Sequence, residues 1–278
     1  MLQVSLNGKI ISASKARFAT DNRAFRFGDS IFETCRYHNA QVPLLDLHLQ
    51  RMFTCMQYIG MEIPAHWNVS WILSCIQDIA DAHAFSFCRV RLTASRQGGG
   101  SYTPERNTPD LLIEVSALPT EKFDTAVITC MLGEYHDMQK STHPVFRCKT
   151  GNALLYVLAA KFARENGYDD VLIFNEKEEI TDAISSNVWV VKNSVLYTTP
   201  DDGGAVLGVM RRYLLENAAA LEVEVGQIAL DPEILLSADE VFLSNAIHGI
   251  RSVSTYQDRT YLNNKGAALL EKLNTQLF

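Results

Sequence analysis

Hydrophobic positions in the N-terminal half alternate in some segments and recur with a helical period in others. Residues 4–11 read as a strand, a turn at Asn7-Gly8 and a second strand, which predicts a β-hairpin. Residues 30–42 predict two further strands. Residues 45–60 have the 3.6-residue period of an amphipathic helix, and residues 69–84 predict a second helix.

The pattern changes after two more predicted strands, at residues 88–95 and 111–116. A proline-containing segment follows them and interrupts the regular patterning. We therefore expect a small N-terminal α+β domain at residues 1–118, a linker at 119–122, and a larger domain at 123–278.

The C-terminal part mixes short strands with two helices. Residues 126–132 predict a strand, and residues 151–166 and 209–221 predict helices. The apolar side of the first helix comprises Leu154, Leu155, Leu158 and Phe162. Further short strands are expected at residues 171–174, 188–191, 195–198 and 240–244. Strands and helices in both halves predict an α+β fold rather than a doubly wound α/β fold.

Charge and cysteine usage narrow the possible partners. The formal net charge is −7 and no basic stripe is present, so we expect no nucleic-acid partner. The N-terminal residues have no basic segment followed by an apolar run, and no stretch is long enough to span a bilayer, so we expect no membrane partner. The six cysteines lie far apart, which favours reduced thiols in a cytoplasmic protein without a metal site.

Lys149 lies directly before the predicted helix at residues 151–166. Its position alone allows two interpretations: a solvated residue near a helix start, or an amine that forms a Schiff base. The second role requires a lowered amine pKa, which burial near other cations supplies. The local sequence leaves both interpretations open.

Several short motifs occur in a fixed order around Lys149. They are RAFRFGDSIFET at residues 23–34, HLQR at 48–51, DVLIFN at 170–175, ITDAISSNVW at 180–189, GVMR at 208–211 and SNAI at 244–247. Each motif is weak alone, but the series from about Val4 to Val253 resembles the class IV aminotransferases, the enzymes of pyridoxal 5'-phosphate (PLP) fold type IV. Members include branched-chain aminotransferases, D-amino acid aminotransferases and 4-amino-4-deoxychorismate lyases.

The resemblance implies PLP as the cofactor and assigns roles by position. Lys149 matches the lysine that binds PLP covalently and moves a proton at the substrate α-carbon. Arg51 matches the phosphate-binding arginine, whose planar fork suits a phosphate group. Val209 and Met210 match a helix start whose backbone N–H groups bind the same phosphate.

Asp182 stands where the family usually has a glutamate that pairs with the pyridine nitrogen of PLP. Aspartate is one methylene shorter, so the ring must lie closer or a water molecule must bridge the gap. Glu179 is the alternative partner, but Asp182 keeps the register with the residues that follow it. Asn245 and Ala246 match the loop that closes over the phosphate from the other side.

The substrate contacts are less sharply indicated. The arginines in segments that line the substrate side in this family are Arg26, Arg36, Arg91 and Arg96. We expect Phe32, Arg26 and Arg96 to contact substrate. Residues 95–102 resemble the lyase loop, but Ser101 stands where that pattern tends to place a second arginine. Phe32 stands where D-amino acid aminotransferases tend to carry a tyrosine, which counts against that activity.

The resemblance also implies a fold and an assembly. The expected fold is the two-domain, D-amino acid aminotransferase-like form of PLP fold type IV, with a smaller N-terminal α/β sandwich and a larger C-terminal barrel-like domain. Family members form homodimers in which one subunit contributes residues to the active site of the other. Phe25, Phe27 and Phe32 are therefore candidate interface residues.

Three functions are compatible with these motifs. We favour 4-amino-4-deoxychorismate lyase, because Met210 stands where transaminases often have threonine, and Ser244-Asn245-Ala246 replaces their hydroxyl-rich phosphate loop. A branched-chain or D-amino acid transaminase is the alternative, since both reactions use the same lysine and the same small-molecule chemistry. A non-catalytic PLP-binding protein is disfavoured by the complete set of Lys149, Arg51 and Asp182.

Overall fold

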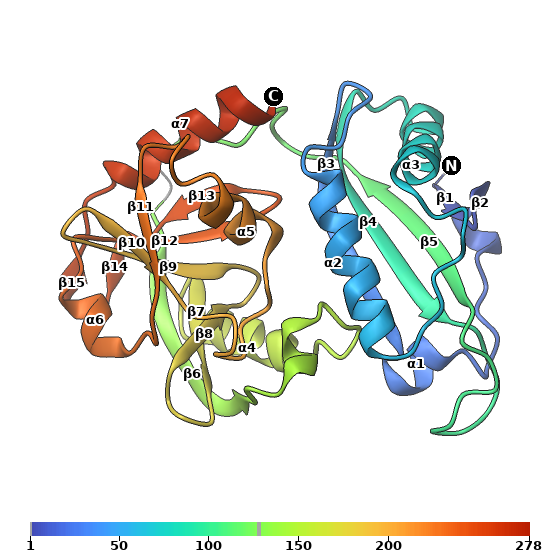
Figure 1. The fold of residues 1–278 in the computed structure, drawn as a ribbon, viewed down its shortest axis with the longest axis horizontal. Helices are drawn as coiled ribbons and strands as arrows, with labels where there is room; N and C mark the ends of the chain where they lie inside the picture. Colours follow the sequence, from blue (N-terminus) through green and yellow to red (C-terminus); the bar gives the residue numbers. More distant parts are fainter. Residues whose placement is uncertain (1, 127–128) are drawn as a thin grey trace. The chain divides into compact units, whose positions relative to one another are not determined.

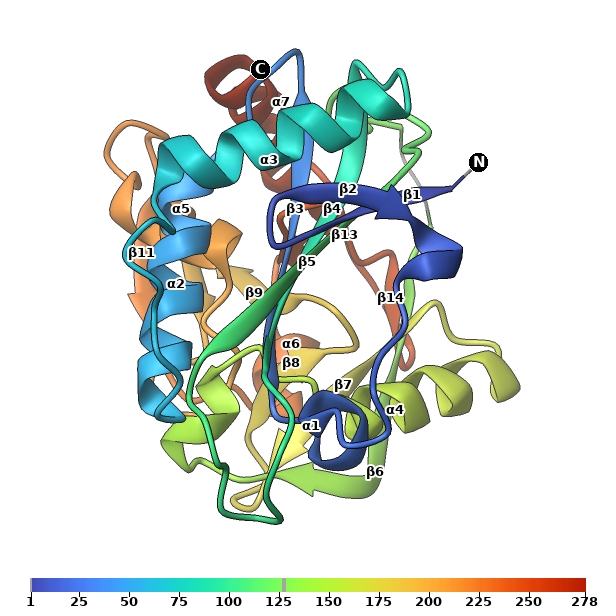
Figure 2. The ribbon, with the colours of Figure 1, turned by 90° about the vertical axis from the view of Figure 1, so that its right-hand side faces the viewer.

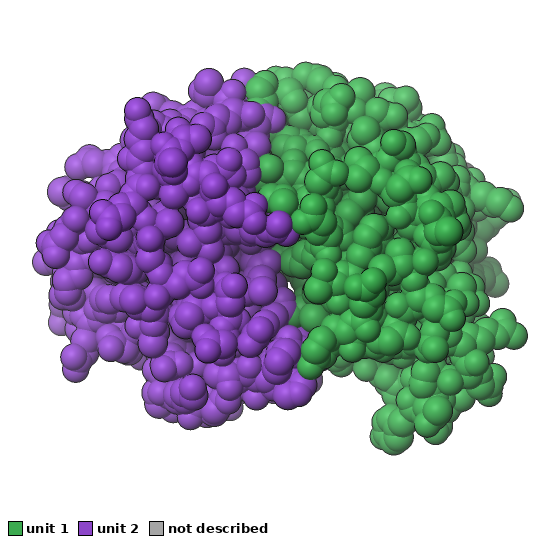
Figure 3. Space-filling model, in the orientation of Figure 1, with its two compact units in different colours: residues 1–121, 148–152, 278 green, residues 122–147, 153–277 purple. Residues whose placement is uncertain are grey.

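The computed structural model describes residues 2–126 and 129–278, which form two compact units (Figure 3). The first unit comprises Met1–Glu121, Cys148–Asn152 and Phe278; the second comprises Lys122–Arg147 and Ala153–Leu277. The main division falls within the segment predicted as a linker. The sequence did not predict that Cys148–Asn152, which contains Lys149, belongs to the first unit. With 28% helix and 32% strand distributed over both units, the α+β prediction is confirmed.

The first unit contains a five-stranded antiparallel sheet in the order β2-β1-β5-β4-β3 (Figure 1). Its strands are β1 (Gln3–Leu6), β2 (Lys9–Ser12), β3 (Ser30–His38), β4 (Phe87–Arg96) and β5 (Pro109–Ser116). The predicted hairpin is confirmed, with Asn7 and Gly8 both at positive φ between β1 and β2. The prediction of two strands in residues 30–42 is wrong. Beyond β3 the chain makes a tight turn, and Gln41 forms only an isolated bridge with His38.

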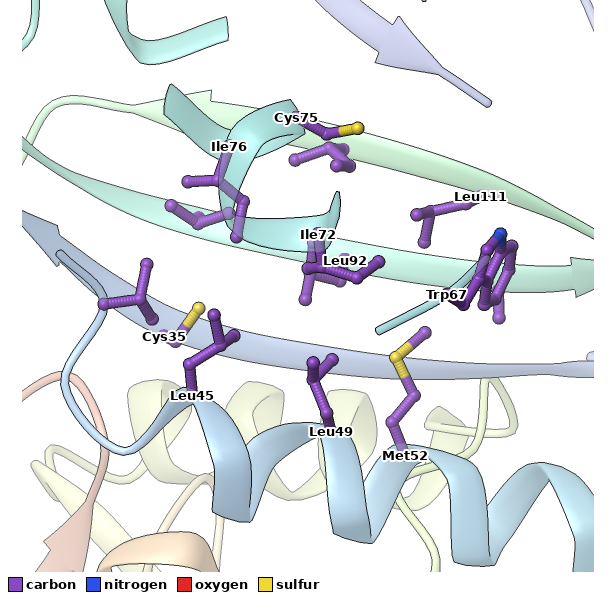
Figure 4. Close-up of a cluster of buried hydrophobic side chains, with 14 of the residues drawn as sticks. Cys35, Leu45, Leu49, Met52, Trp67, Ile72, Cys75, Ile76, Leu92 and Leu111 are labelled. Atoms are coloured by element: carbon purple, nitrogen blue, oxygen red, sulfur yellow. The ribbon is translucent and has the colours of Figure 1, made fainter. Parts of the chain in front are cut away.

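Two long helices cover one face of this sheet. The helices of the unit are α1 (Arg23–Phe27), α2 (Leu45–Tyr58) and α3 (Val69–Ala82), with a 3-10 turn at Ala13–Lys15. The side chain of Asn68 caps α3 by accepting a hydrogen bond from the N–H of Trp71. In Figure 4, Leu45, Leu49 and Met52 of α2 point toward the strand that carries Cys35, while Ile72 and Ile76 of α3 lie in the same cluster.

The second unit contains a ten-stranded sheet in which β11-β10-β9-β8-β7-β6-β14-β15 are neighbours and β12 pairs with both β9 and β13. Its strands are β6 (Met131–Lys140), β7 (Asp170–Asn175), β8 (Ile180–Ala183), β9 (Asn187–Lys192), β10 (Val195–Thr198), β11 (Glu224–Gln227), β12 (Glu240–Asn245), β13 (Gly249–Ser252), β14 (Thr255–Tyr256) and β15 (Arg259–Thr260). The strand predicted at residues 126–132 overlaps β6 only at its end, and its residues 127 and 128 lie outside the described part of the chain.

The helices of the second unit differ in detail from their predictions. They are α4 (Leu154–Glu165), α5 (Val209–Glu216), α6 (Pro232–Leu236) and α7 (Lys265–Leu277), with a 3-10 turn at Pro144–Arg147 (Figure 2). Both α4 and α5 are shorter than predicted. The face of α4 is also different, because Leu155, Ala159 and Ala163 are buried whereas Leu154 is 65% exposed. Within the described residues, no helix has the length and apolar character needed to cross a membrane.

Candidate functional site

The segment that carries Lys149 is aligned along the outer edge of β3. Ile31 and Thr150 form an antiparallel bridge, and the N–H of Phe32 donates to the carbonyl oxygen of Lys149 at 2.9 Å. The Lys149 side chain lies across the Phe32 ring, with Nζ 4.4 Å from the ring centroid. Because α4 begins only at Leu154, Lys149 is held by a strand edge and an aromatic ring rather than by a helix start.

Gly28 allows the Lys149 segment to approach the end of α1. Gly28 has φ +66°, and a Cβ atom at this position would lie 2.3 Å from the Oδ1 atom of Asn152. The Asn152 amide also donates to the carbonyl oxygen of Gly28 at 3.3 Å. The two sequence motifs at residues 23–34 and 149–152 therefore form one packed structure, and any side chain at residue 28 would push them apart.

Arg51 lies on α2 and pairs with Glu33 of β3. Its Nε and Nη2 atoms donate to the two carboxylate oxygens of Glu33 at 2.7 and 2.5 Å, and His48 Nδ1 lies 2.7 Å from the same carboxylate. Burial raises the pKa of Glu33, but the charges and hydrogen bonds of Arg51 and His48 outweigh it and lower this pKa to about 2. Burial lowers the pKa of Arg51, but Glu33 outweighs this and raises it. Arg51 is therefore a cation whose guanidinium group already donates two hydrogen bonds to one carboxylate, that of Glu33.

The sheet face opposite to α2 carries Phe32 and Arg91. Residues two apart on a strand share a face, so Phe32 and Thr34 point away from the side of Glu33. The guanidinium carbon of Arg91 lies 3.8 Å from the centroid of the Phe32 ring. Burial lowers the pKa of Arg91, yet an arginine remains charged at neutral pH. Phe32 is thus in contact with two cations, Lys149 and Arg91.

The other expected substrate arginines have different surroundings. Arg96 is 4% exposed. It donates to Asp29, to the carbonyl oxygens of Ile59 and Gly60, and to Asn107. Arg26 is exposed on α1 and donates to the carbonyl oxygen of Thr20. Ser101 lies in an exposed loop whose backbone oxygen accepts from Arg23. The substrate roles of Arg26 and Arg96 stay predictions.

In the second unit, Asp182 is the centre of a buried polar cluster. It lies on β8 opposite Ile173, which packs against α4, so both side chains point to the α4 side of the sheet. Its carboxylate accepts hydrogen bonds from Lys140 Nζ at 2.6 Å, Asn187 Nδ2 at 3.1 Å, Tyr156 Oη at 3.2 Å and the N–H of Val206 at 3.2 Å. The residue is only 3% exposed. Two of these partners, Lys140 and Tyr156, received no structural role from the sequence.

The alternative carboxylate, Glu179, lies outside this cluster. Its side chain accepts from the amide of Asn175 at 2.8 Å and so stabilises the turn between β7 and β8. Burial, followed by the negative charge of Asp182, raises the pKa of Tyr156 well above its ordinary value. Tyr156 therefore keeps its proton and donates a hydrogen bond to the Asp182 carboxylate.

The start of α5 adjoins the Asp182 cluster through Asn187. Gly208 precedes the helix, and a Cβ atom there would lie 2.0 Å from the Oδ1 atom of Asn187. Asn187 in turn donates to Asp182. No side chain caps α5, whose first turn contains the buried residues Val209 and Met210. The first-turn N–H groups and the positive end of the helix dipole thus belong to the surroundings of Asn187.

The end of β12 reaches the same region from another direction. Asn245 donates to Ser186 Oγ at 3.0 Å, one residue before Asn187. Its own Oδ1 accepts from the N–H groups of Ile247 and His248, which closes a turn around Ala246. The motifs at residues 180–189, 208–211 and 244–247 therefore meet in one part of the second unit.

The chain is similar to known proteins over most of its length. The family model for amino-transferase class IV matches residues 30–256. A branched-chain-amino-acid aminotransferase of Salmonella typhimurium is 25% identical over 262 residues, covering 90% of this chain and 84% of that protein. An aminodeoxychorismate lyase of Bacillus subtilis is 24% identical over 270 residues, covering 95% and 90%.

The fold has counterparts among solved structures. A branched-chain aminotransferase from Thermoproteus uzoniensis superposes with a TM-score of 0.87 at 20% identity, covering 99% of this chain and 94% of that one. The likeness extends over both units and includes the elements that carry the motifs. The chain therefore belongs to the class IV aminotransferase family.

Proposed function

We propose that this protein is a PLP-dependent enzyme that acts at a substrate amino group, with Lys149 as the residue that holds the cofactor. The observation that carries the proposal is the position of the Lys149 amine over the Phe32 ring. Phe32 lies on β3, which also carries Glu33, the partner of Arg51 on α2. Two other lysines are less suited to covalent attachment. Lys140 forms a buried ion pair with Asp182, and Lys161 pairs with Glu165 on an exposed helix face.

Enzymes of this family use PLP, and the residues of this chain suit its charged groups. The uncapped start of α5 and the cation of Arg51 suit a phosphate, because backbone N–H groups and a guanidinium both favour anions. The buried carboxylate of Asp182 suits a protonated ring nitrogen. When bound, PLP supplies an aldehyde that takes up an amine and a ring that withdraws electrons from the neighbouring carbon.

The remaining work is done by the chain itself. Lys149 would hold the cofactor, and its amine, once freed, would move a proton at the substrate α-carbon. Phe32 provides an apolar wall beside that amine, and Arg91 offers a cation to a substrate carboxylate. We assign the cofactor phosphate to the start of α5 and to the turn after β12, that is, to Val209, Met210, Asn245 and Ala246.

The activity that we propose is that of 4-amino-4-deoxychorismate lyase, which eliminates pyruvate and yields p-aminobenzoate for folate synthesis. Met210 supports it, because a buried methionine at the start of α5 offers no hydroxyl group where transaminases often have threonine. The turn around Ala246 also has fewer hydroxyl side chains than the phosphate loop common in transaminases. The lyase of Bacillus subtilis is among the relatives that match nearly the whole chain.

An amino acid transaminase of the branched-chain or D-amino acid type is the second candidate. It is favoured by the branched-chain relative, which matches at the same level of identity. A paired assay separates the two activities. The purified protein is offered aminodeoxychorismate, with p-aminobenzoate measured as product, and separately a panel of L- and D-amino acids with 2-oxoglutarate or pyruvate. Transamination without release of p-aminobenzoate would overturn the lyase proposal.

We also propose that the protein is a homodimer in the cytoplasm. The support is a pair of exposed apolar side chains on α4 of the second unit, Leu154 and Val157, which are 65% and 61% exposed. In the first unit, Phe25 on α1 is 84% exposed. Large apolar side chains gathered on an exposed helix face are typical of interfaces.

A further inference from the structure

Lys140 and Asp182 form an ion pair inside the second unit. Lys140 ends β6 and Asp182 lies on β8, with β7 between the two strands. Their side chains are 2% and 4% exposed, and the Nζ and Oδ2 atoms are 2.6 Å apart. The positive and negative charges are therefore paired out of contact with solvent.

The fold alone gives little reason for this lysine. Removing an ammonium group from water is costly, and apolar residues in place of a buried ion pair are often as stabilising. Lys140 has a second close partner, the hydroxyl of Tyr156 at 2.9 Å, which itself donates to Asp182. A longer contact reaches the carbonyl oxygen of Phe146 at 3.5 Å, so the two short contacts of Lys140 are the carboxylate and the hydroxyl group that donates to it.

The contacts also fix the orientation of Asp182. Asp182 accepts hydrogen bonds from three side chains and from the N–H of Val206, which is shared between the two carboxylate oxygens at 3.3 and 3.2 Å. Oδ1 is held by Asn187, and Oδ2 is held by Lys140 and Tyr156. Since both oxygens are engaged, rotation of the carboxylate would break at least one hydrogen bond to a charged group.

We infer that Lys140 is a positioning residue for Asp182: it fixes the carboxylate and reduces the negative charge that Asp182 presents to the ring nitrogen of the cofactor. The inference rests on the proposed function, in which Asp182 pairs with that nitrogen. A carboxylate balanced by an ammonium group attracts a second cation less than an unbalanced carboxylate does. The other groups that contact Asp182 are Tyr156 from α4, Asn187 from β9 and the backbone of Val206, and none of them is a cation.

The consequence is a ring nitrogen that is only partly protonated in the wild-type enzyme. This state can be measured without turnover, by loading the protein with PLP labelled with ¹⁵N in the ring and recording the nitrogen chemical shift at neutral pH. Lys140→Gln removes the charge and keeps a polar side chain, whereas Lys140→Arg keeps the charge. Lys161→Gln, on the exposed face of α4, is the matched control.

We expect an intermediate ¹⁵N shift in the wild type. In Lys140→Gln, the ratio of protonated to unprotonated ring nitrogen should rise by about tenfold, equivalent to about 1.4 kcal/mol. Lys140→Arg and Lys161→Gln should remain within about twofold of the wild type, a difference of about 0.4 kcal/mol.

Either of two results would overturn the inference alone. The first is a folded Lys140→Gln variant whose nitrogen shift equals that of the wild type. The second is a fully protonated ring nitrogen in the wild type, which is decisive even where Lys140→Gln fails to fold. A wild-type protein that takes up no PLP, or takes it up at a lysine other than Lys149, would overturn the proposed function as well. The two failures are therefore distinguishable from the wild-type sample.

Discussion

Glu33→Gln tests whether the buried pair with Arg51 stabilises the first unit. Glu33 is fully buried, and its partners are Arg51 and His48. Glutamine has nearly the same shape but no charge, so the substitution removes the electrostatic attraction and leaves the packing in place. Because Arg51 then remains as a nearly buried cation without its carboxylate partner, the folded state should be destabilised.

The magnitude follows from the pKa of Glu33, which is lowered from 4.5 to about 2. A pKa lowered by this much corresponds to about 3 kcal/mol of stabilisation of the folded state. The folded-state pKa is the lower one, so this stabilisation is fully present above pH 4.5 and is lost as the pH falls toward 2. More than half of it should be gone at about pH 3.

The assay is urea unfolding of wild type and Glu33→Gln over a series of pH values between about 7 and 3. At neutral pH we expect the variant to be less stable by about 3 kcal/mol, and the difference should shrink as the pH falls. Glu165→Gln is the control, because its carboxylate belongs to an exposed pair and should matter by less than about 0.5 kcal/mol. A difference between wild type and Glu33→Gln that is constant over the whole pH range would refute the reasoning.

Three further experiments test the other assignments. After borohydride reduction of the PLP-loaded protein, peptide mapping should find the pyridoxyl group on Lys149. Lys149→Ala should lose this label and nearly all turnover. A label on Lys140 would contradict the assignment. Asp182→Asn should lower turnover at least about a hundredfold, or about 2.7 kcal/mol, while Asp182→Glu retains substantial activity, as measured by steady-state kinetics. Sedimentation should show a dimer, and Leu154→Glu should weaken it, whereas a fully active wild-type monomer would exclude the proposed assembly.

The helices show which structural features the periodicity of the sequence can predict and which it cannot. A 3.6-residue period predicted α2 and α3 correctly, because each has one continuous apolar stripe that packs on the sheet. For α4 the period predicted a helix but not its buried face. The face against β6 and β7 uses Ala159 and Ala163, whose small side chains allow close approach, while Leu154 remains exposed. Which stripe is buried depends on the partner surface, and one segment alone does not contain that information.

In the candidate site, the sequence predicted some residues but not the groups that contact them. The motif order predicted the positions of Lys149, Arg51 and Asp182, and those assignments remain predictions about cofactor binding. Their partners could not be predicted, because they depend on how distant strands pair. Asp182 meets Lys140 from 42 residues away along the chain, and Arg51 meets Glu33 from 18 residues away. Glu33 lies within a recognised motif, but only the alternation of β3 indicates that it points toward α2.

Arg51 pairs with Glu33, and we also propose that it binds the cofactor phosphate, so a single substitution of Arg51 would affect both stability and cofactor binding. Arg51→Ala should weaken cofactor binding by about 1.5–3 kcal/mol, the usual contribution of a hydrogen bond to a charged group. It also leaves Glu33 buried without its guanidinium partner, which should destabilise the fold by about 3–5 kcal/mol.

The double variant Arg51→Met/Glu33→Gln separates the two effects, because it removes both charges and leaves neither group unpaired. Binding of pyridoxamine 5'-phosphate, which forms no covalent bond to Lys149, should then report the phosphate contact alone. We expect the double variant to be more stable than Arg51→Ala in urea unfolding and still to bind this ligand at least about tenfold more weakly than the wild type, a loss of about 1.4 kcal/mol or more. Wild-type affinity in the double variant would mean that Arg51 serves only to neutralise Glu33, and that the phosphate is held by other groups.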